Sequence, residues 1–151
     1  MDTPKKDKSF GCIAFCPQDG GRFLLVQHRA NDGSGGHWSF PKGHANEFEH
    51  KTDAALRELV EETGLRPDEF SRDMIFEDEY TYAHEDGYTI EKTVTYFVAC
   101  FFDLYDPQPE IDEEISTAEW FTFSAAEKKL FDSTAETLKE ARLELSLNGL
   151  L

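Results

Sequence analysis

The sequence lacks the features that mark secreted, disulfide-rich or membrane-spanning proteins. Its three cysteines, Cys12, Cys16 and Cys100, are an odd number in apolar surroundings, which predicts buried free thiols in a reducing compartment. No segment approaches the ~20 apolar residues of a spanning helix, and the polar start MDTPKKDKS lacks the apolar core of a signal peptide. We therefore expect no membrane partner and a cytosolic or nuclear location, with the cytoplasm as the default.

Basic residues are also scarce. The chain has 15 lysines and arginines against 31 acidic residues, which gives a net charge of −16 and a pI of about 4.5. Proteins that bind nucleic acid need a basic surface, so nucleic acid is not expected as the main partner. A small polyanion stays compatible with this charge where metal ions and a local basic cluster neutralise it.

The chain is rich enough in apolar residues to fold as one domain. It has 151 residues, of which 39% are hydrophobic and 13 are phenylalanine. Residues 1–8 are interpreted as a flexible arm and residues 9–151 as a single domain. Strands are predicted over residues 10–16, 22–27, 74–82, 89–102 and 117–123. We expect the first two to form a hairpin, residues 74–82 and 89–102 to form an antiparallel pair, and residues 30–36 to be a glycine-rich connector.

Two helical segments separate these strands, with a shorter helix capped by Ser124. The later segment is residues 133–147, whose apolar face combines Leu138, Ala141 and Leu145 and is widened by Leu143 and Leu147. Strands before, between and after separated helices predict an α/β fold, with a mixed sheet covered by helices on both sides.

The earlier helix carries the densest chemistry. It is predicted over residues 52–63, with Thr52 or Asp53 as N-cap and Gly64 as a left-handed C-cap. Its apolar face comprises Ala55, Leu56, Leu59 and Val60. Glu58, Glu61 and Glu62, at i, i+3 and i+4, lie together on the other side and repel one another. Mg²⁺ prefers oxygen ligands and would relieve that repulsion; the alternative is a solvated acidic surface.

The stretch GHANEFEHKTDAALRELVEETGL, residues 43–65, resembles the Nudix box at every fixed position. Those positions are Gly43, Glu49, Arg57-Glu58-Leu59, Glu61-Glu62 and Gly64-Leu65. The resemblance implies the Nudix fold, an α/β/α sandwich with a mixed sheet over nearly the whole chain. It also implies a metal-dependent hydrolase that uses Mg²⁺, with Mn²⁺ as the alternative ion.

The resemblance further implies a set of site residues. The metal ligands would be Glu58, Glu62, commonly Glu61, the backbone carbonyl of Lys42 and a loop acid. One of these carboxylates would orient or deprotonate the attacking water. The loop acid lies within residues 110–114, where Glu114 is preferred and Glu113 is next. Arg57 is included in the catalytic set because it can orient carboxylates by bidentate pairing, with Glu49 also in support.

One position departs from the family pattern. Phe48 stands where family members usually have the glycine that precedes the first glutamate of the box. We therefore expect the turn at residues 46–49 to be formed differently.

Residues outside the box indicate which substrate the enzyme would cleave. His37-Trp38-Ser39-Phe40-Pro41-Lys42-Gly43-His44 resembles the lead-in of the asymmetric diadenosine tetraphosphate hydrolases, and Lys92-Thr93-Val94-Thr95-Tyr96-Phe97 does so more loosely. Lys42, His44 and Lys92 can meet phosphates, and Tyr82 can stack on adenine or simply pack in its strand. Trp38 is a substrate-binding candidate for which core packing is the favoured alternative. The hypothesis is hydrolysis of diadenosine tetraphosphate to ATP and AMP.

Other functions stay open at this point. The same box serves pyrophosphohydrolases of nucleoside triphosphates, RNA 5′ ends or diphosphoinositol phosphates. An isopentenyl diphosphate isomerase needs a catalytic cysteine, and the three cysteines lie in strand-like runs. A non-catalytic nucleotide-binding domain has no need of a crowded acid cluster. A monomer is the default, because nothing in the sequence reveals an oligomeric state.

Overall fold

The computed structural model describes residues 3–30, 35–110 and 114–151. Its elements follow in chain order. They are β1 (Lys5–Cys16), a 3₁₀ turn (Gln18–Gly20), β2 (Arg22–Arg29), β3 (Gly35–Ser39), β4 (Lys42–Gly43), α1 (Lys51–Thr63), β5 (Glu69–Ala83), β6 (Thr89–Cys100), β7 (Ile115–Phe121), α2 (Phe123–Lys129) and α3 (Asp132–Leu147).

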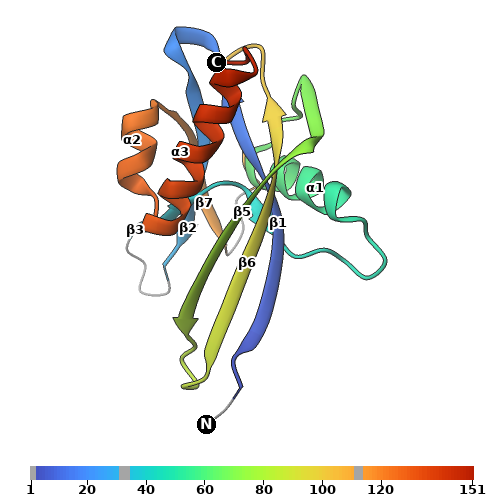
Figure 1. Cartoon of the computed structure of the whole chain (residues 1–151), viewed down its shortest axis with the longest axis vertical. Coiled ribbons are helices and arrows are strands. Elements are labelled where there is room, and N and C mark those ends of the chain that lie inside the picture. The colour runs from blue at the N-terminus through green and yellow to red at the C-terminus, as the bar shows by residue number, and fades with distance from the viewer. Residues whose placement is uncertain (1–2, 31–34, 111–113) are drawn as a thin grey trace.

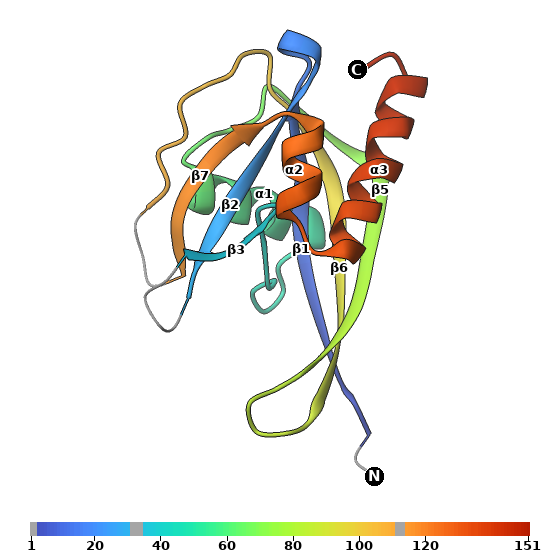
Figure 2. The ribbon, with the colours of Figure 1, turned by 90° about the vertical axis from the view of Figure 1, so that its left-hand side faces the viewer.

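The strands form one mixed sheet in the order β3-β2-β1-β6-β5, with β4 paired to β1 and β7 paired to β2. The β1–β6 pair is parallel and the other pairs are antiparallel. Helix α1 covers one face, and α2 and α3 cover the other (Figures 1 and 2). Strands β1, β5 and β6 continue beyond the helices as a three-stranded ribbon. The predicted α/β architecture is confirmed.

The sheet separates two apolar cores because successive side chains of a strand point to opposite faces. In β1, Ile13 and Phe15 pack in the core that contains Leu138 of α3. Their neighbours Cys12 and Ala14 pack in the core that contains Leu59 of α1. All of these side chains are fully buried. The alternation therefore positions one helix layer on each side of β1.

The prediction of a flexible arm over residues 1–8 is wrong for residues 5–8. Strand β1 begins at Lys5, so residues 5–8 belong to the sheet, and residues 1–2 of the predicted arm lie outside the described residues. These residues pair with β6 in a continuous parallel register from Lys5 opposite Ile90 to Phe15 opposite Cys100. A long neighbouring strand stabilises a polar segment that has little strand propensity of its own.

The predicted helices are confirmed, but several details at their ends and faces are corrected. His50, rather than Thr52 or Asp53, caps α1, and its Nδ1 accepts the Thr52 amide at 3.2 Å. Gly64 does adopt the left-handed conformation, with φ 72°. Thr122 replaces Ser124 as the cap of α2.

Helix α3 buries a narrower face than predicted. Leu138, Ala141 and Leu145 are fully buried, whereas Leu143 and Leu147 are exposed to solvent and do not widen the face. A helix that lies on a sheet contacts it along one stripe, which explains the difference. Cys12 and Cys16 are buried free thiols as expected, while the free thiol of Cys100 is half-buried. No described helix is long and apolar enough to cross a membrane.

Candidate active site

Strand β4 brings the acidic face of α1 against the sheet. The glycine at position 43 is required there, because a Cβ atom would overlap the carboxylate of Glu58. The preceding amide, that of Lys42, points at Oε1 of Glu62 over 3.4 Å, a long hydrogen bond. The dipeptide Lys42–Gly43 therefore contacts two of the three glutamates.

The three glutamates of α1 differ in their surroundings. Glu62 is only 7% exposed, the side chain of Glu58 is half-buried, and the side chain of Glu61 is 52% exposed. Burial, followed by a hydrogen bond and charge repulsion from Glu58, raises the pKa of Glu62 well above its ordinary value. Burial therefore disfavours a charged Glu62 beside Glu58, and a cation next to Glu62 would offset that cost.

Arg57 holds the other side of this acidic face. Its Nε and Nη2 donate to both oxygens of Glu49 at 2.9 and 3.0 Å, which is a bidentate pair. Its Nη1 donates to Glu58 at 3.0 Å and to Glu61 at 3.1 Å, and its Nη2 also reaches the carbonyl of His44 at 2.9 Å. The pKa of Arg57 is raised above its ordinary value, mainly by the hydrogen bonds that it donates to Glu49. Arg57 therefore ties the loop after β4 to α1.

The turn at Asn46–Glu49 corrects the expectation for Phe48. Phe48 has φ 64°, so the phenylalanine adopts the left-handed backbone that glycine favours. The Asn46 amide donates to Glu49 Oε1 at 2.9 Å, and the Glu49 amide donates to the Asn46 carbonyl at 3.0 Å. The turn is thus not rebuilt around Phe48, whose ring is 98% exposed.

A cavity of about 610 Å³ opens on the other face of the sheet, beside α3. Residues from separate strands and from the start of α3 line it. Those that bear on its chemistry are His28, His37, Lys42, Tyr82, Lys92 and Phe131. Because the Lys42 side chain lines this cavity while its amide faces Glu62, strand β4 joins the cavity to the acidic face of α1.

Aromatic rings form the walls of the cavity. The His28 and His37 rings are stacked with centroids 4.3 Å apart, and the His37 and Phe131 rings are stacked at 5.0 Å. Burial, then the nearby charges of His37 and Lys42, lowers the pKa of His28 to about 3. Burial and Lys42 likewise lower the pKa of His37. Both imidazoles are therefore neutral at pH 7, and Tyr82 and Phe131 remain exposed at the opening.

Two lysines supply the positive charge of the cavity. Lys92 is buried, and its Nζ donates to Asp7 Oδ2 and to Ser9 Oγ, each at 2.6 Å. In the part of the chain that the structure describes, the ammonium of Lys42 has no ion pair. Burial and the charge of Lys92 lower the pKa of Lys42. An anion in the cavity would compensate both lysines.

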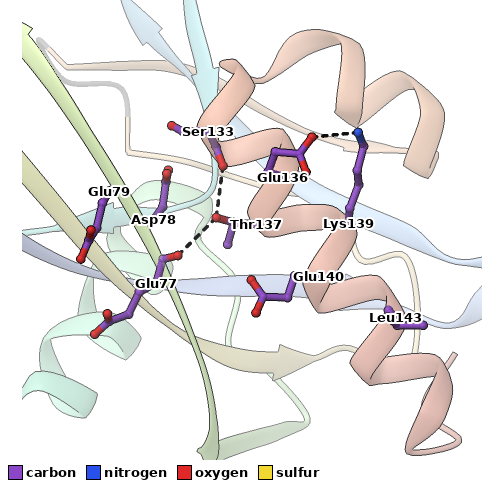
Figure 3. Close-up of a pocket in the computed structure, with 9 residues that line it drawn as sticks. All are labelled: Glu77, Asp78, Glu79, Ser133, Glu136, Thr137, Lys139, Glu140 and Leu143. Atoms are coloured by element: carbon purple, nitrogen blue, oxygen red, sulfur yellow. Dashed lines mark hydrogen bonds and ion pairs between the residues drawn. The ribbon is translucent and has the colours of Figure 1, made fainter.

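A second hollow, of about 550 Å³, lies between β5 and α3 (Figure 3). Its lining is acidic, with Glu77, Asp78, Glu79, Glu136 and Glu140 against a single lysine, Lys139. The two hollows are similar in size, so charge distinguishes them. A polyphosphate is repelled by the second hollow and attracted by the first.

Comparison with known proteins places the chain in a family. A model described as the NUDIX domain matches residues 5–141. The chain belongs to the Nudix hydrolase family. The asymmetrical bis(5′-nucleosyl)-tetraphosphatase of Rattus norvegicus is 34% identical over 119 residues, which cover 78% of this chain and 76% of that protein. The m7GpppN-mRNA hydrolase of Saccharomyces cerevisiae is 27% identical over 118 residues, which cover 74% of this chain but only 10% of that protein.

Solved structures share the Nudix fold of this chain. A Caenorhabditis elegans Ap4A hydrolase in a binary complex has a TM-score of 0.74 and 24% identity, over 92% of this chain and 97% of that one. The NUDIX domain of Shewanella oneidensis NrtR, complexed with ADP ribose, has a TM-score of 0.72 and 19% identity, over 96% of this chain and 90% of that one.

Nudix hydrolases generally use divalent metal ions, and the paired carboxyl groups of Glu58 and Glu62 fit one. A divalent cation between the two carboxyl groups would compensate the charge that burial disfavours on Glu62. Among the described residues, no three His, Cys, Asp or Glu side chains converge as a metal site. In particular, the Glu61 carboxylate lies with Arg57. The residues that would hold the ion are Glu58, Glu62 and the carbonyl oxygen of Lys42, with Glu61 and Glu114 as further candidates.

The remaining predicted residues lie in different places. His44 is exposed and is not among the residues lining the cavity; its Nε2 lies 2.7 Å from Asp7 Oδ1. Trp38 is not among the residues lining the cavity; its ring packs edge-on against Phe121, so the core-packing alternative describes its position. Glu114 is exposed, and its carbonyl accepts the Arg29 amide at 2.7 Å. Glu113 lies outside the described residues.

Sequence reasoning did not assign His28, His37, Phe131 or Asp7 to the site. His37 lay in a recognised flank, but its ring was given no role. Phe131 precedes a helix and belongs to no motif, and Asp7 fell in the segment interpreted as a flexible arm. Residues 5–8 are all charged and show no apolar alternation, so the sequence carries no strand signal at Asp7.

Proposed function

We propose that this Nudix hydrolase cleaves a dinucleoside polyphosphate, with diadenosine tetraphosphate as the favoured substrate and ATP and AMP as products. The observation that carries the proposal is the position of Lys42. Its ammonium lies in an aromatic cavity and has no ion pair among residues 3–30, 35–110 and 114–151, and its amide lies against Glu62. A phosphate chain that follows β4 would run from the cavity to the carboxylates.

The cavity suits a nucleoside at one end of that chain. Tyr82 and Phe131 are exposed at its opening and offer faces on which a base can stack. The neutral rings of His28 and His37 extend the apolar wall without adding charge. Lys42 and Lys92 then neutralise phosphates next to the base.

The acidic face of α1 suits the reacting end. A bound Mg²⁺ would polarise a phosphoryl oxygen and promote ionisation of the attacking water. The chain's own residues position the reaction: Glu58 and Glu62 hold charge at one place, and Arg57 keeps the loop after β4 against the helix. Phosphoryl transfer depends mainly on such positioning and on charge neutralisation.

The relatives support this substrate to different degrees. The rat tetraphosphatase matches over most of both chains, whereas the yeast decapping protein matches over a tenth of its length. The net charge of −16 also disfavours binding of a long RNA chain as substrate. Cleavage of capped RNA, nucleoside triphosphates or diphosphoinositol phosphates is therefore the alternative to be tested.

Product chromatography after incubation with Mg²⁺ tests the proposal. The expected result is ATP and AMP in equal amounts from diadenosine tetraphosphate, with a higher kcat/KM than for the alternative substrates in the same panel. Two molecules of ADP, no cleavage, or a preference for capped RNA would contradict it. Omission of divalent metal should abolish turnover.

A further inference from the structure

The side chains of Lys92 and His44 share one anionic partner, which comes from the N-terminal end of β1. Asp7 accepts from Lys92 Nζ through Oδ2 at 2.6 Å, and its Oδ1 lies 2.7 Å from His44 Nε2. We infer that Asp7 is a positioning residue, whose carboxylate fixes the Lys92 ammonium and the His44 ring at the edge of the cavity toward the phosphate chain. This inference rests on the proposed function.

The strand register places Asp7 where it can do this. In the parallel β1–β6 pair, Asp7 lies opposite Lys92. Its neighbours in β1 are Lys6 and Lys8, so a shift of one residue would place a lysine beside Lys92 and create repulsion. The residue two places on, Ser9, faces the same side and also accepts from Lys92 at 2.6 Å. The sequence of β1 therefore specifies both partners of one ammonium.

Lys92 needs a counter-charge because it is only 7% exposed. Removing one member of a buried ion pair leaves an uncompensated charge, which is strongly unfavourable. Burial opposes the charged form of Asp7, but the hydrogen bonds from Lys92 and His44 outweigh it, so the pKa of Asp7 is lowered. The ammonium has three donors, and Asp7 and Ser9 use two. One donor is left for a ligand in the cavity.

Full-length Asp7→Ala and Asp7→Asn variants test the inference with diadenosine tetraphosphate and Mg²⁺. Loss of a charged hydrogen-bond partner should raise KM about tenfold, with kcat changed less than about twofold. Asp7→Asn should be intermediate, because its amide oxygen can still accept from Lys92. In a Lys92→Met background, Asp7→Ala should add little, because both changes remove the same function.

A control and a turnover-free measurement complete the test. Glu91 is exposed and adjacent to Lys92 in β6, so Glu91→Gln changes the net charge equally and should leave KM unaltered. Calorimetry measures the affinity for inorganic tripolyphosphate in the absence of divalent metal. This affinity should be about tenfold weaker in Asp7→Ala than in the wild type.

The outcomes separate this inference from the proposed function. Turnover of diadenosine tetraphosphate with an unchanged or lowered KM in Asp7→Ala would overturn the role of Asp7 alone. Absence of turnover in the wild type would overturn the proposed substrate, and tripolyphosphate binding would then decide the role of Asp7. The role of Asp7 would also be contradicted if the effects of Asp7→Ala and Lys92→Met on KM were additive, or if Glu91→Gln raised KM as much as Asp7→Ala does. Thermal unfolding verifies that each variant is folded.

Discussion

In each half of the candidate site, burial disfavours the charged form of one side chain, and the two side chains carry opposite charges. On the α1 side, burial raises the pKa of Glu62 and disfavours its carboxylate. On the α3 side, burial lowers the pKa of Lys42 and disfavours its ammonium. A cation relieves the first half and an anion relieves the second, and β4 joins them. The comparison explains why a metal-bound polyphosphate suits a site that neither a free metal nor a free phosphate would satisfy alone.

The largest effect should come from the buried member of the acidic half. Glu62→Gln should lower kcat/KM by about 10²-fold or more, because it removes a charge on which the transition state depends. Its fold should persist, since an amide escapes the cost of a buried carboxylate. The matched change Glu61→Gln should have a much smaller effect, because Glu61 is 52% exposed and lies with Arg57. Initial rates with Mg²⁺ give the kcat/KM of both variants. Equal losses of kcat/KM would contradict the expected difference between Glu62 and Glu61.

In the other half, Phe131 should matter through its ring face. Stacking of a base is worth ~1–3 kcal/mol, so Phe131→Ala should raise KM for diadenosine tetraphosphate about tenfold with little change in kcat. Phe102 is a matched control, because the two rings are 56% and 54% exposed and Phe102 is absent from the residues lining the cavity. Phe102→Ala should leave KM unchanged. A similar rise in both variants would assign the effect to general destabilisation.

These two halves also differ in how far the sequence predicts them. The acidic half lies within residues 43–64, where helical spacing alone places Glu58, Glu61 and Glu62 on one side. Residues of β2, β3, β4, β5, β6 and α3 line the cavity, so the sheet order brings His28 and Phe131 to one cavity, and no local pattern specifies that order. Even the acidic half was predictable only in part, because helical spacing does not specify the contacts that Arg57 makes with Glu49 and the His44 carbonyl in the loop after β4.

The neutral state of His28 predicts how the cavity half responds to acid. His28 takes up a proton near pH 3 in the folded protein and near pH 6.5 in the unfolded chain. Between these values the unfolded state binds more protons, so the free energy of unfolding falls as the pH is lowered. The contribution approaches about 1.4 kcal/mol per pH unit by pH 5. His28→Asn, compared with wild type by urea unfolding from pH 7 to 5, should show a shallower decline. Parallel declines would mean that His28 accepts its proton without loss of stability.

The smallest effect concerns the loop that Arg57 ties to α1. Phe48 is 98% exposed, so its ring contributes little packing, yet its φ of 64° carries the cost of a left-handed backbone. Phe48→Gly should therefore stabilise the protein by at most about 1 kcal/mol, because glycine relieves that cost but adds entropy to the unfolded chain. For a chain of this size, the unfolding midpoint should rise by at most about 2–4 °C. Phe48→Ala separates the two causes, because alanine removes the ring and keeps the left-handed strain. An equal rise in both variants would trace the gain to the lost ring; a rise confined to Phe48→Gly would trace it to the backbone of the turn that presents Glu49 to Arg57.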